Sequence, residues 1–336
     1  MDGTSVRSPG RISLNKFYSH CSSRHGAWQT MSMEKSRYIW MDGQLVPWED
    51  ATIHVLTHAL HYGSGVFEGI RAYETPDGPA IFRHKDHMDR LVRSANAYGI
   101  PIPQTSDQLM DAARQVISSN ELNEGYIRPL VFFGLGSMGL NPAGASVHTM
   151  VAAWKWGTYL GDEGVQNGIR VRVSSWRRID PSSLIPSSKG TGGYLNSILA
   201  KTEAVKAGYD EAIMLNMAGF VSEGSGENIF LVRDGAITTP PLSDGCLGGI
   251  TRDSVMQIMR DDGYEVREQS LTRSDIYHAD EVLMCGTAAE VTPVRECDDR
   301  IIGTGKPGPV TRGVQDTFAK AVTGQLDRYE HWLDYV

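Results

Sequence analysis

The sequence lacks several features that mark whole classes of proteins. It has only four cysteines, Cys21, Cys246, Cys285 and Cys297, and none has CxxC spacing. Such scattered cysteines argue against a disulfide framework or a structural zinc site and are typical of a reducing compartment. Basic residues are outnumbered, with 32 Lys and Arg against 40 Asp and Glu and a net charge of −8. An acidic chain lacks the basic surface that sequence-independent DNA binding needs.

Long apolar runs are also missing, since none comes near the roughly 18 residues of a membrane span. The chain of 336 residues is long enough for two domains, at roughly 150 residues each. A hydrophobic fraction of 40% and a charged fraction of 21% exclude a wholly disordered or collagen-like chain. We therefore expect a soluble, cytoplasmic protein of enzyme size. Glycine is abundant, with 36 residues, and its placement is informative.

Residues 1–36 differ from the rest of the chain. They are rich in Ser and Arg, nearly free of acids, and have no apolar segment of a secretory signal. We expect a disordered N-terminal extension, or translation from a start upstream of Met31 or Met33. A transit peptide is the alternative, because Arg7 and Arg11 are basic.

From Tyr38 onward, short strands and helices are expected. Hairpins should turn at Asp42-Gly43 and Asp77-Gly78. Apolar spacing predicts helices over 86–98, 106–118, 194–207 and 251–262, and strands over 126–134, 146–156, 169–176, 211–216, 228–233, 236–239 and 281–286.

These elements do not alternate as βαβ units, so the predicted fold class is α/β of the mixed α+β kind. Hydrophobic periodicity is lost after residue 157 and returns at residue 169. We therefore expect a small α/β domain over 37–157, an interdomain linker over 158–168 and a large domain over 169–336.

Two glycine motifs resemble nucleotide-binding loops. Gly134–Gly139 spells G-x-G-x-x-G after a strand, but Asn141-Pro142 leaves no room for the helix that would hold a pyrophosphate. Gly303–Lys306 resembles part of a P-loop, yet Pro307 stands where Ser or Thr is needed. Both are better explained as turns.

Histidines provide a rival hypothesis from another enzyme class. His54, His58 and His61 have the spacing i, i+4, i+7, which could present metal ligands on one helix face, and His84 and His87 follow. The HVLTH run lacks the glutamate of a zinc protease. An ordinary polar or core role explains these histidines as well, so a metalloenzyme is only the runner-up.

Lys189 stands among small residues in the run Pro186–Tyr194, in a turn before a predicted helix. Small neighbours leave room for a planar ligand, and a neutral lysine amine can form a Schiff base. Taken alone, this segment is better explained as an exposed loop.

Three further segments favour a reactive lysine over an exposed loop residue. Glu223 and Glu227 flank glycines between two apolar runs, where a carboxylate can reach the ring nitrogen of pyridoxal phosphate. Gly248–Arg252 leads into a helix N-terminus, which can bind a phosphate. Cys285–Glu290 ends a strand in small residues whose amides could hold a carboxylate. Together they favour an enzyme that uses pyridoxal phosphate.

With these segments the chain resembles the class IV aminotransferases, which are pyridoxal-phosphate enzymes of fold type IV, and in particular the bacterial branched-chain-amino-acid enzymes. The resemblance covers about 37–336, in the family's order and rough spacing. It is carried by HALHYGSGVFEGIRAY (58–73), DHMDRLVRSA (86–95), YIRPLVF (126–132), WKWGTYLG (154–161), KGTGGYLNS (189–197), VSEGSGENIF (221–230), GGITRD (248–253) and CGTAAEVTPV (285–294).

The resemblance implies two domains, the larger C-terminal one binding pyridoxal 5'-phosphate, with the active site at their interface. It implies transfer of the amino group of Leu, Ile or Val to 2-oxoglutarate, giving branched 2-oxo acids and L-glutamate. Its implied partners are small amino acids and 2-oxo acids, without nucleic acid or membrane. It also implies at least a homodimer, with the 134–141 loop reaching the neighbouring site. D-amino-acid transaminases, (R)-amine transaminases, aminodeoxychorismate lyases and a non-catalytic cofactor-storing protein remain alternatives.

The resemblance also implies roles for single residues toward the cofactor. Lys189 would form the Schiff base and act as the catalytic base, Glu223 would pair with the pyridine nitrogen, and Tyr194 would bond the phenolic oxygen. The phosphate would be held by Arg90 and by the amides of Ile250, Thr251 and Thr287.

Substrate carboxylates would be held by Tyr126, Arg128 and the amides of Thr287 and Ala288. Tyr126 and Arg128 are two residues apart on a predicted strand, so both side chains point to one face. The side-chain pocket would be lined by Tyr62, Phe67, Met138, Leu140, Trp156 and Tyr159. The chain departs from the family at Gly190-Thr191, where Ala-Gly is usual, and at Gly248, where Pro is frequent.

Overall fold

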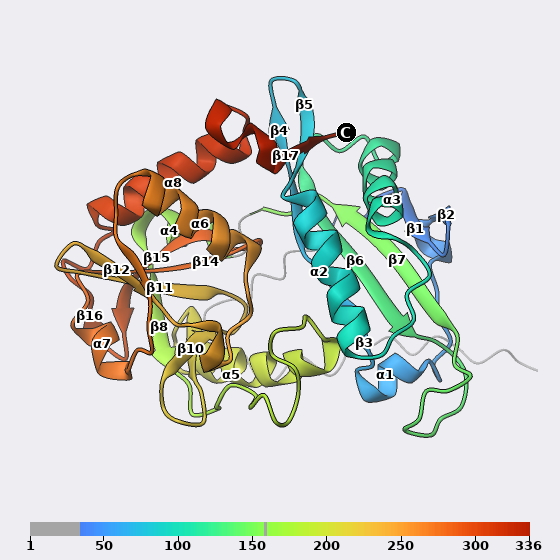
Figure 1. The fold of residues 1–336 in the computed structure, drawn as a ribbon, viewed down its shortest axis with the longest axis horizontal. Coiled ribbons are helices and arrows are strands. Elements are labelled where there is room, and N and C mark those ends of the chain that lie inside the picture. Colours follow the sequence, from blue (N-terminus) through green and yellow to red (C-terminus); the bar gives the residue numbers. More distant parts are fainter. Residues whose placement is uncertain (1–33, 158–159) are drawn as a thin grey trace, which may run out of the picture. The chain divides into compact units, whose positions relative to one another are not determined.

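The computed structural model describes residues 34–157 and 160–336. These residues form two β-sheets with helices packed against them (Figure 1). The first sheet has the order β17-β5-β4-β6-β7-β1-β2, with β3 paired to β6, and these neighbouring strands are antiparallel. Its strands are β1 (Tyr38–Met41), β2 (Gln44–Pro47), β3 (Gly65–Phe67), β4 (Ile70–Thr75), β5 (Gly78–Phe82), β6 (Gly125–Phe133), β7 (Val147–Trp154) and β17 (Leu333–Tyr335). The C-terminal strand thus returns to a sheet built from the first half of the chain.

Helices α2 (His84–Ala97) and α3 (Ser106–Ser119) pack together on the first sheet, as Figure 1 shows in teal and green. Thr105 caps α3, because its side chain accepts from the Gln108 amide while the Gln108 side chain accepts from the Thr105 amide. The short helix α1 (His58–Tyr62) precedes β3. Leu91, Val116 and further apolar side chains fill the core between helices and sheet.

The second sheet has the order β10-β9-β8-β15-β14-β11-β12-β13, with β16 paired to β15. It is mixed, because β8 runs parallel to both β9 and β15 whereas β14 runs antiparallel to β11 and β15. Its strands are β8 (Ile169–Val173), β9 (Glu211–Leu215), β10 (Val221–Gly224), β11 (Asn228–Arg233), β12 (Ala236–Thr239), β13 (Val266–Glu268), β14 (Glu281–Gly286), β15 (Glu290–Cys297) and β16 (Arg300–Ile301). The predicted mixed fold class is confirmed.

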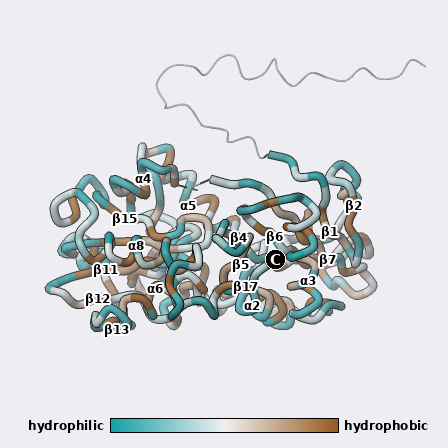
Figure 2. The backbone as a smooth tube through the Cα atoms, turned by 90° about the horizontal axis from the view of Figure 1, so that it is seen from above, coloured by the Kyte–Doolittle hydropathy of each residue, from teal (hydrophilic) through white to brown (hydrophobic). Residues whose placement is uncertain are grey.

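Both faces of the second sheet are buried. Along β11, Phe230 and Val232 join one apolar core while Ile229 and Leu231 join another, as strand alternation requires. The accompanying helices are α4 (Gly161–Asn167), α5 (Tyr194–Lys206), α6 (Ile250–Asp261), α7 (Arg273–Tyr277) and α8 (Pro309–Val322). Figure 2 shows hydrophobic stretches inside the layered body and hydrophilic stretches along its outer turns.

The expected hairpins, helices and strands are present in the structure. Both hairpins turn where predicted, with Met41 opposite Gln44 and Thr75 opposite Gly78. The predicted helices and strands are present within a few residues, and residues 134–146 connect β6 to β7 without a helix. The expected linker contains the short helix α4. The elements that the sequence did not predict are α1, β3, β10, β13, α7, β15, β16, α8 and β17.

The remaining expectations concern the N-terminal extension and membrane-spanning helices. The predicted N-terminal extension lies outside the described residues except for 34–36, where Ser36 donates a hydrogen bond to the Ala153 carbonyl. Among the helices of the described residues, none combines the length and apolarity of a membrane span.

Candidate active site

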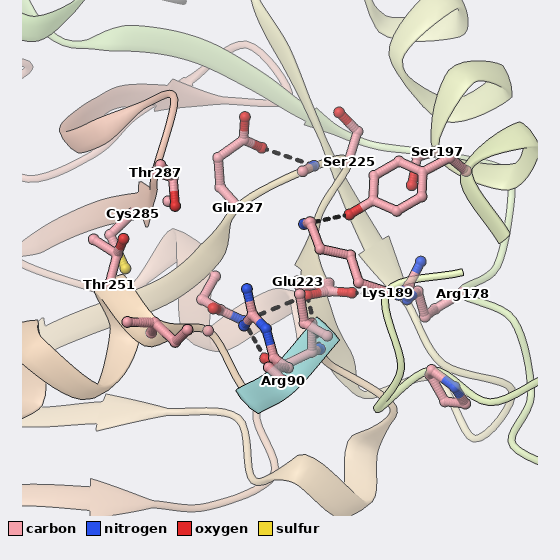
Figure 3. Close-up of a pocket in the computed structure, with 18 of the residues that line it drawn as sticks. Arg90, Arg178, Lys189, Ser197, Glu223, Ser225, Glu227, Thr251, Cys285 and Thr287 are labelled. Carbon is pink, nitrogen blue, oxygen red and sulfur yellow. Dashed lines mark hydrogen bonds and ion pairs between the residues drawn. The ribbon is translucent and has the colours of Figure 1, made fainter. Parts of the chain in front are cut away.

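A cavity of about 550 Å³ opens where α2, β10, β14 and the first turns of α5 and α6 meet (Figure 3). We call it the Lys189 cavity. The seven residues that the sequence predicts around a cofactor all line it: Arg90, Lys189, Tyr194, Glu223, Ile250, Thr251 and Thr287. They come from both halves of the chain, so the fold brings together residues that are far apart in sequence.

The backbone at Lys189 is fixed by elements of the first sheet and its helices. Its amide donates to Ser94 Oγ on α2 at 3.1 Å, and its carbonyl accepts from the Phe67 amide at 3.0 Å. The side chain extends into the cavity, where Nζ lies 2.7 Å from Tyr194 OH (Figure 3). Lys189 is therefore a lysine in the cavity wall with a defined partner and not an exposed loop residue.

The departure at Gly190 has a local explanation. A Cβ on Gly190 would lie 2.8 Å from atoms of the Tyr98 ring, closer than real Cβ atoms come. Thr191 donates its hydroxyl to the Gly63 carbonyl at 2.7 Å. The Gly-Thr pair thus fits the side chain of Tyr98 on one side and the backbone of Gly63 on the other.

Glu223 projects from β10 into one end of the cavity and accepts from three donors. Arg178 lies 2.7 Å from Oε1, while the Leu247 amide and the Asn228 side-chain amide lie 3.0 and 3.3 Å from Oε2. The sequence interpretation missed Arg178, because its only signal is a basic pair after a strand. The donors hold the carboxylate in one orientation and balance its charge.

Another part of the cavity wall is suited to an anion. Ile250 and Thr251 open α6 with N–H groups that no helical carbonyl can satisfy, next to the side chain of Arg90. A Cβ on Gly249 would overlap the Asn228 side-chain oxygen, so the approach to this helix requires glycine. A helix N-terminus beside a guanidinium is a typical phosphate site.

Arg90 is held by groups that the sequence interpretation also missed. It donates to both oxygens of Glu68, at 2.6 and 2.8 Å, and to the Gly248 carbonyl at 2.7 Å. Burial alone would raise the pKa of Glu68, but Arg90 and then His87 hold that pKa well below its usual range. Burial also lowers the pKa of His87 to about 4, against the opposing effect of Glu68. The sequence signal for this pair is that Glu68 lies in an apolar run around Val66, because a buried carboxylate needs a cation partner.

A second cavity, of about 890 Å³, adjoins the first and shares Lys189 and Tyr194 with it. We call it the Arg128 cavity. Arg128 NH2 lies 3.1 Å from Tyr126 OH, so these side chains share one face of β6 as predicted. Other predicted residues that line this cavity are Phe67, Trp156, Thr287 and Ala288.

Aromatic rings surround the guanidinium of Arg128. Its central carbon lies 4.8 Å from the Phe67 ring centroid and 5.2 Å from that of Tyr126. Tyr126 in turn packs edge-on against Trp156, with centroids 4.5 Å apart. A cavity of this kind offers both a carboxylate partner and apolar faces.

Three predicted pocket residues, Tyr62, Met138 and Leu140, are not among those that line either cavity. Tyr62 donates to the Met138 carbonyl at 2.7 Å, and both side chains are exposed on α1 and the 134–146 segment. Leu140 is 82% exposed, and Tyr159 lies outside the described residues. Their role in the pocket stays a prediction.

The histidines do not converge on a metal site. His58 contacts Ser64 Oγ through Nδ1 at 2.6 Å and the Gly139 carbonyl through Nε2 at 3.1 Å. His61 contacts the Val55 carbonyl at 2.9 Å. Within residues 34–157 and 160–336, no three His, Cys, Asp or Glu side chains are grouped to hold a metal ion. The runner-up hypothesis therefore has no geometric support.

Comparisons with known proteins point in one direction. The family model for Amino-transferase class IV matches residues 65–297. A branched-chain-amino-acid aminotransferase of Escherichia coli (strain K12) is 49% identical over 307 residues, which are 91% of this chain and 99% of that protein. The crystal structure of the Escherichia coli enzyme matches with a TM-score of 0.88 and 49% identity, covering 89% of this chain and 99% of that chain.

A solved relative also carries the cofactor. The branched-chain amino acid aminotransferase from Thermobaculum terrenum, in its PLP-form, matches with a TM-score of 0.83 and 34% identity. The match covers 89% of this chain and 98% of that chain. Sequence and structure comparisons therefore agree with each other over nearly the same part of the chain.

Proposed function

Because this chain belongs to the class IV aminotransferases, we propose that it transfers the amino group of L-Leu, L-Ile and L-Val to 2-oxoglutarate with pyridoxal 5'-phosphate. The products are branched 2-oxo acids and L-glutamate. One observation carries the proposal: the amine of Lys189 faces two adjoining cavities, one lined by an anion site and a held carboxylate, the other by Arg128 and aromatic rings.

The residues of the Lys189 cavity fit this cofactor. Arg90 and the free amides at the start of α6 suit its phosphate, and the carboxylate of Glu223 suits its pyridine nitrogen. A Cβ on Gly226 would meet nothing within 4 Å, which leaves open space beside a planar ring. When bound, the cofactor supplies an electron sink that weakens the bonds at the α-carbon of the amino acid.

Lys189 is the group that moves protons. Its Nζ lines both cavities, so it can take the proton from the α-carbon of the substrate and return it. Tyr194 OH, at 2.7 Å, holds the amine in position. Glu223, fixed by Arg178 at 2.7 Å, presents its carboxylate to the cavity.

The Arg128 cavity explains how one site can accept two kinds of substrate. Arg128 and Tyr126 can grip the second carboxylate of glutamate, and Phe67 and Trp156 offer apolar faces to branched side chains. Thr287 and Ala288 line the same cavity, and we assign their backbone amides to the binding of a substrate carboxylate.

We infer a small domain over 37–157 and a large domain over 169–336, joined by 158–168. The two sheets support this division, since their strands fall on either side of the linker except for β17. A cytoplasmic location is supported by Cys246, Cys285 and Cys297, which are free and buried.

We also infer at least a homodimer, with a higher homo-oligomer as an alternative. Exposed apolar side chains gather around α1 and the 134–146 segment, among them Val55, Leu60 and Leu140, which are 73%, 62% and 82% exposed. Apolar surface of this kind is typical of a protein interface. In a dimer the 134–141 loop would reach the partner's site. Light scattering on the purified protein tests this, and a monomer would contradict it.

A panel of amino donors tests the proposed activity. L-Leu, L-Ile and L-Val should react with 2-oxoglutarate, whereas D-Ala and (R)-1-phenylethylamine should not. Preference for D-Ala or the amine would move the protein to another activity of the same fold. A purified protein without a yellow chromophore that borohydride reduces would contradict the cofactor assignment.

A further inference from the structure

Glu227 is a buried acid for which the proposed reaction has no use. It directly precedes β11, is 3% exposed, and lines both the Lys189 cavity and the Arg128 cavity. Its Cγ would lie 3.8 Å from a Cβ on Gly286, so its side chain reaches the wall that carries Thr287. Figure 3 shows Glu227 and Thr287 on the same side of Lys189.

The charges around Glu227 do not balance if every acid is ionised. Glu211 on β9 is fully buried and lies 2.6 Å from Lys201 on α5. Glu223 on β10 is paired with Arg178. Lys201 is the cation that acts most strongly on Glu227, and it is already paired with Glu211, so ionisation of both carboxylates would set two buried negative charges against one ammonium.

These surroundings favour the protonated form of Glu227. Burial first, and then the negative charge of Glu211, raise the pKa of Glu227 to about 8, against the opposing effects of Lys201 and the Gly226 N–H. That N–H donates to Oε2 at 3.1 Å. Cys285 on β14 stays neutral because burial raises its pKa to about 12. Lys189, Tyr194 and Arg128 also line the cavities that Glu227 lines.

The wall beside Glu227 is also where a substrate anion is expected. Thr287 and Ala288 line the Arg128 cavity together with Glu227. Two negative charges close together in one cavity repel each other. A neutral Glu227 removes that repulsion, and a bound anion in turn favours the proton on Glu227.

We propose that Glu227 controls the binding of substrate carboxylates: its protonated form admits the anion beside Thr287 and Ala288, and its ionised form repels it. Glu227 is thus a positioning residue for the anion site and not a group that reacts. The inference rests on the proposed function for the place of the carboxylate, but it needs no particular side chain on the substrate.

The probe that tests it is 4-methylvaleric acid, because it has a carboxylate and no amine. Its affinity for the holoenzyme is measured by calorimetry between about pH 6.5 and 9.5, where the probe itself stays ionised. The dissociation constant should rise roughly tenfold from pH 7 to pH 9. Near pH 8, buffers of different ionisation enthalpy should report the uptake of about half a proton per ligand.

Glu227→Gln mimics the protonated acid. This variant should bind the probe at every pH as the unchanged protein does at pH 7, and without proton uptake. Glu265→Gln makes the same chemical change at an exposed position and should leave the profile unaltered. Lys189 is present in all these proteins, so the comparison between the variants isolates the contribution of Glu227. An unchanged pH profile and proton uptake in Glu227→Gln would overturn the proposal.

A second variant keeps the acid and changes its neighbour. Glu211→Gln removes the charge that disfavours ionisation of Glu227, so the weakening of probe binding should begin at lower pH. An unmoved midpoint would also count against the proposal. The donor panel described above reports separately on the proposed function, because the probe requires only a carboxylate site.

Discussion

The two cavities differ in how their charged side chains are paired. In the Lys189 cavity Arg90 is gripped by Glu68, and Glu223 is gripped by Arg178. In the Arg128 cavity the guanidinium contacts one phenol and two ring faces, and among the described residues its Nε has no hydrogen-bond partner. The first arrangement suits a ligand that stays, and the second suits ligands that change at each half-reaction.

This difference explains how one protein can be rigid and adaptable within adjoining cavities. Charged groups that are already paired lose little freedom when the cofactor binds, so its position is set in advance. A guanidinium without a carboxylate partner can accept one from glutamate, and can remain against the rings when leucine binds instead. Variants that affect only one cavity test the comparison.

Lys189→Ala has the largest expected effect because Lys189 serves both cavities. Turnover should fall by more than about a thousandfold, since among the described residues no other lysine lines the two cavities to move the α-proton. Transaminase rates with L-Leu and 2-oxoglutarate measure the loss, and borohydride should no longer fix the chromophore to the protein. Lys85→Ala, at an exposed lysine of α2, is the matched control and should keep its activity. Substantial transamination by Lys189→Ala would contradict the site.

Glu68→Gln should affect the Lys189 cavity alone. The carboxylate that holds Arg90 would be lost, while a group of the same shape remains. A charge-assisted hydrogen bond of this kind contributes about 1.5–3 kcal/mol, so affinity for pyridoxal 5'-phosphate should fall by roughly tenfold to a hundredfold. Titration of the apoprotein with cofactor measures this. At saturating cofactor the KM for L-Leu should not change, and a raised KM would show that the cavities are not independent.

Arg128→Ala should affect the Arg128 cavity alone. The KM for glutamate and 2-oxoglutarate should rise by about tenfold to a hundredfold, because one charged contact to the second carboxylate is lost. The KM for L-Leu should change much less, and the affinity for cofactor should stay the same. Arg128→Lys should recover part of the loss, since it restores the charge without the bidentate fork. Equal effects on glutamate and leucine would contradict the assigned role.

The sequence was informative where structure depends on neighbouring residues. Asp42-Gly43 and Asp77-Gly78 predict hairpins because turn geometry is a local property. Apolar spacing located α2 and α3 for the same reason, since a helix face is defined within a few turns.

Pairing over long distances left no such signal. Arg178 is bound to Glu223 only because β10 folds back beside it, and no spacing rule connects the two. The same is true of β17, whose Leu333 pairs with Phe82. The cofactor residues were predicted from family resemblance, whereas the partners that hold them required coordinates.

Gly190→Ala has the smallest expected effect and tests the packing beside Lys189. Gly190 has φ −82° and ψ 136°, which any residue adopts, so only the contact with Tyr98 opposes a side chain there. The variant should lose about 1 kcal/mol in urea unfolding, because the Tyr98 ring must shift.

In a Tyr98→Ala background the same substitution should cost nothing, or stabilise by about 0.4–1 kcal/mol, because alanine restricts the unfolded chain more than glycine does. This double-mutant cycle isolates the contact between the two residues. The same cost in both backgrounds would mean that Tyr98 does not explain the glycine. A vanishing cost would show that the family's usual alanine is excluded here by one aromatic ring, and that the backbone of Lys189, fixed by Phe67 and Ser94, tolerates the change.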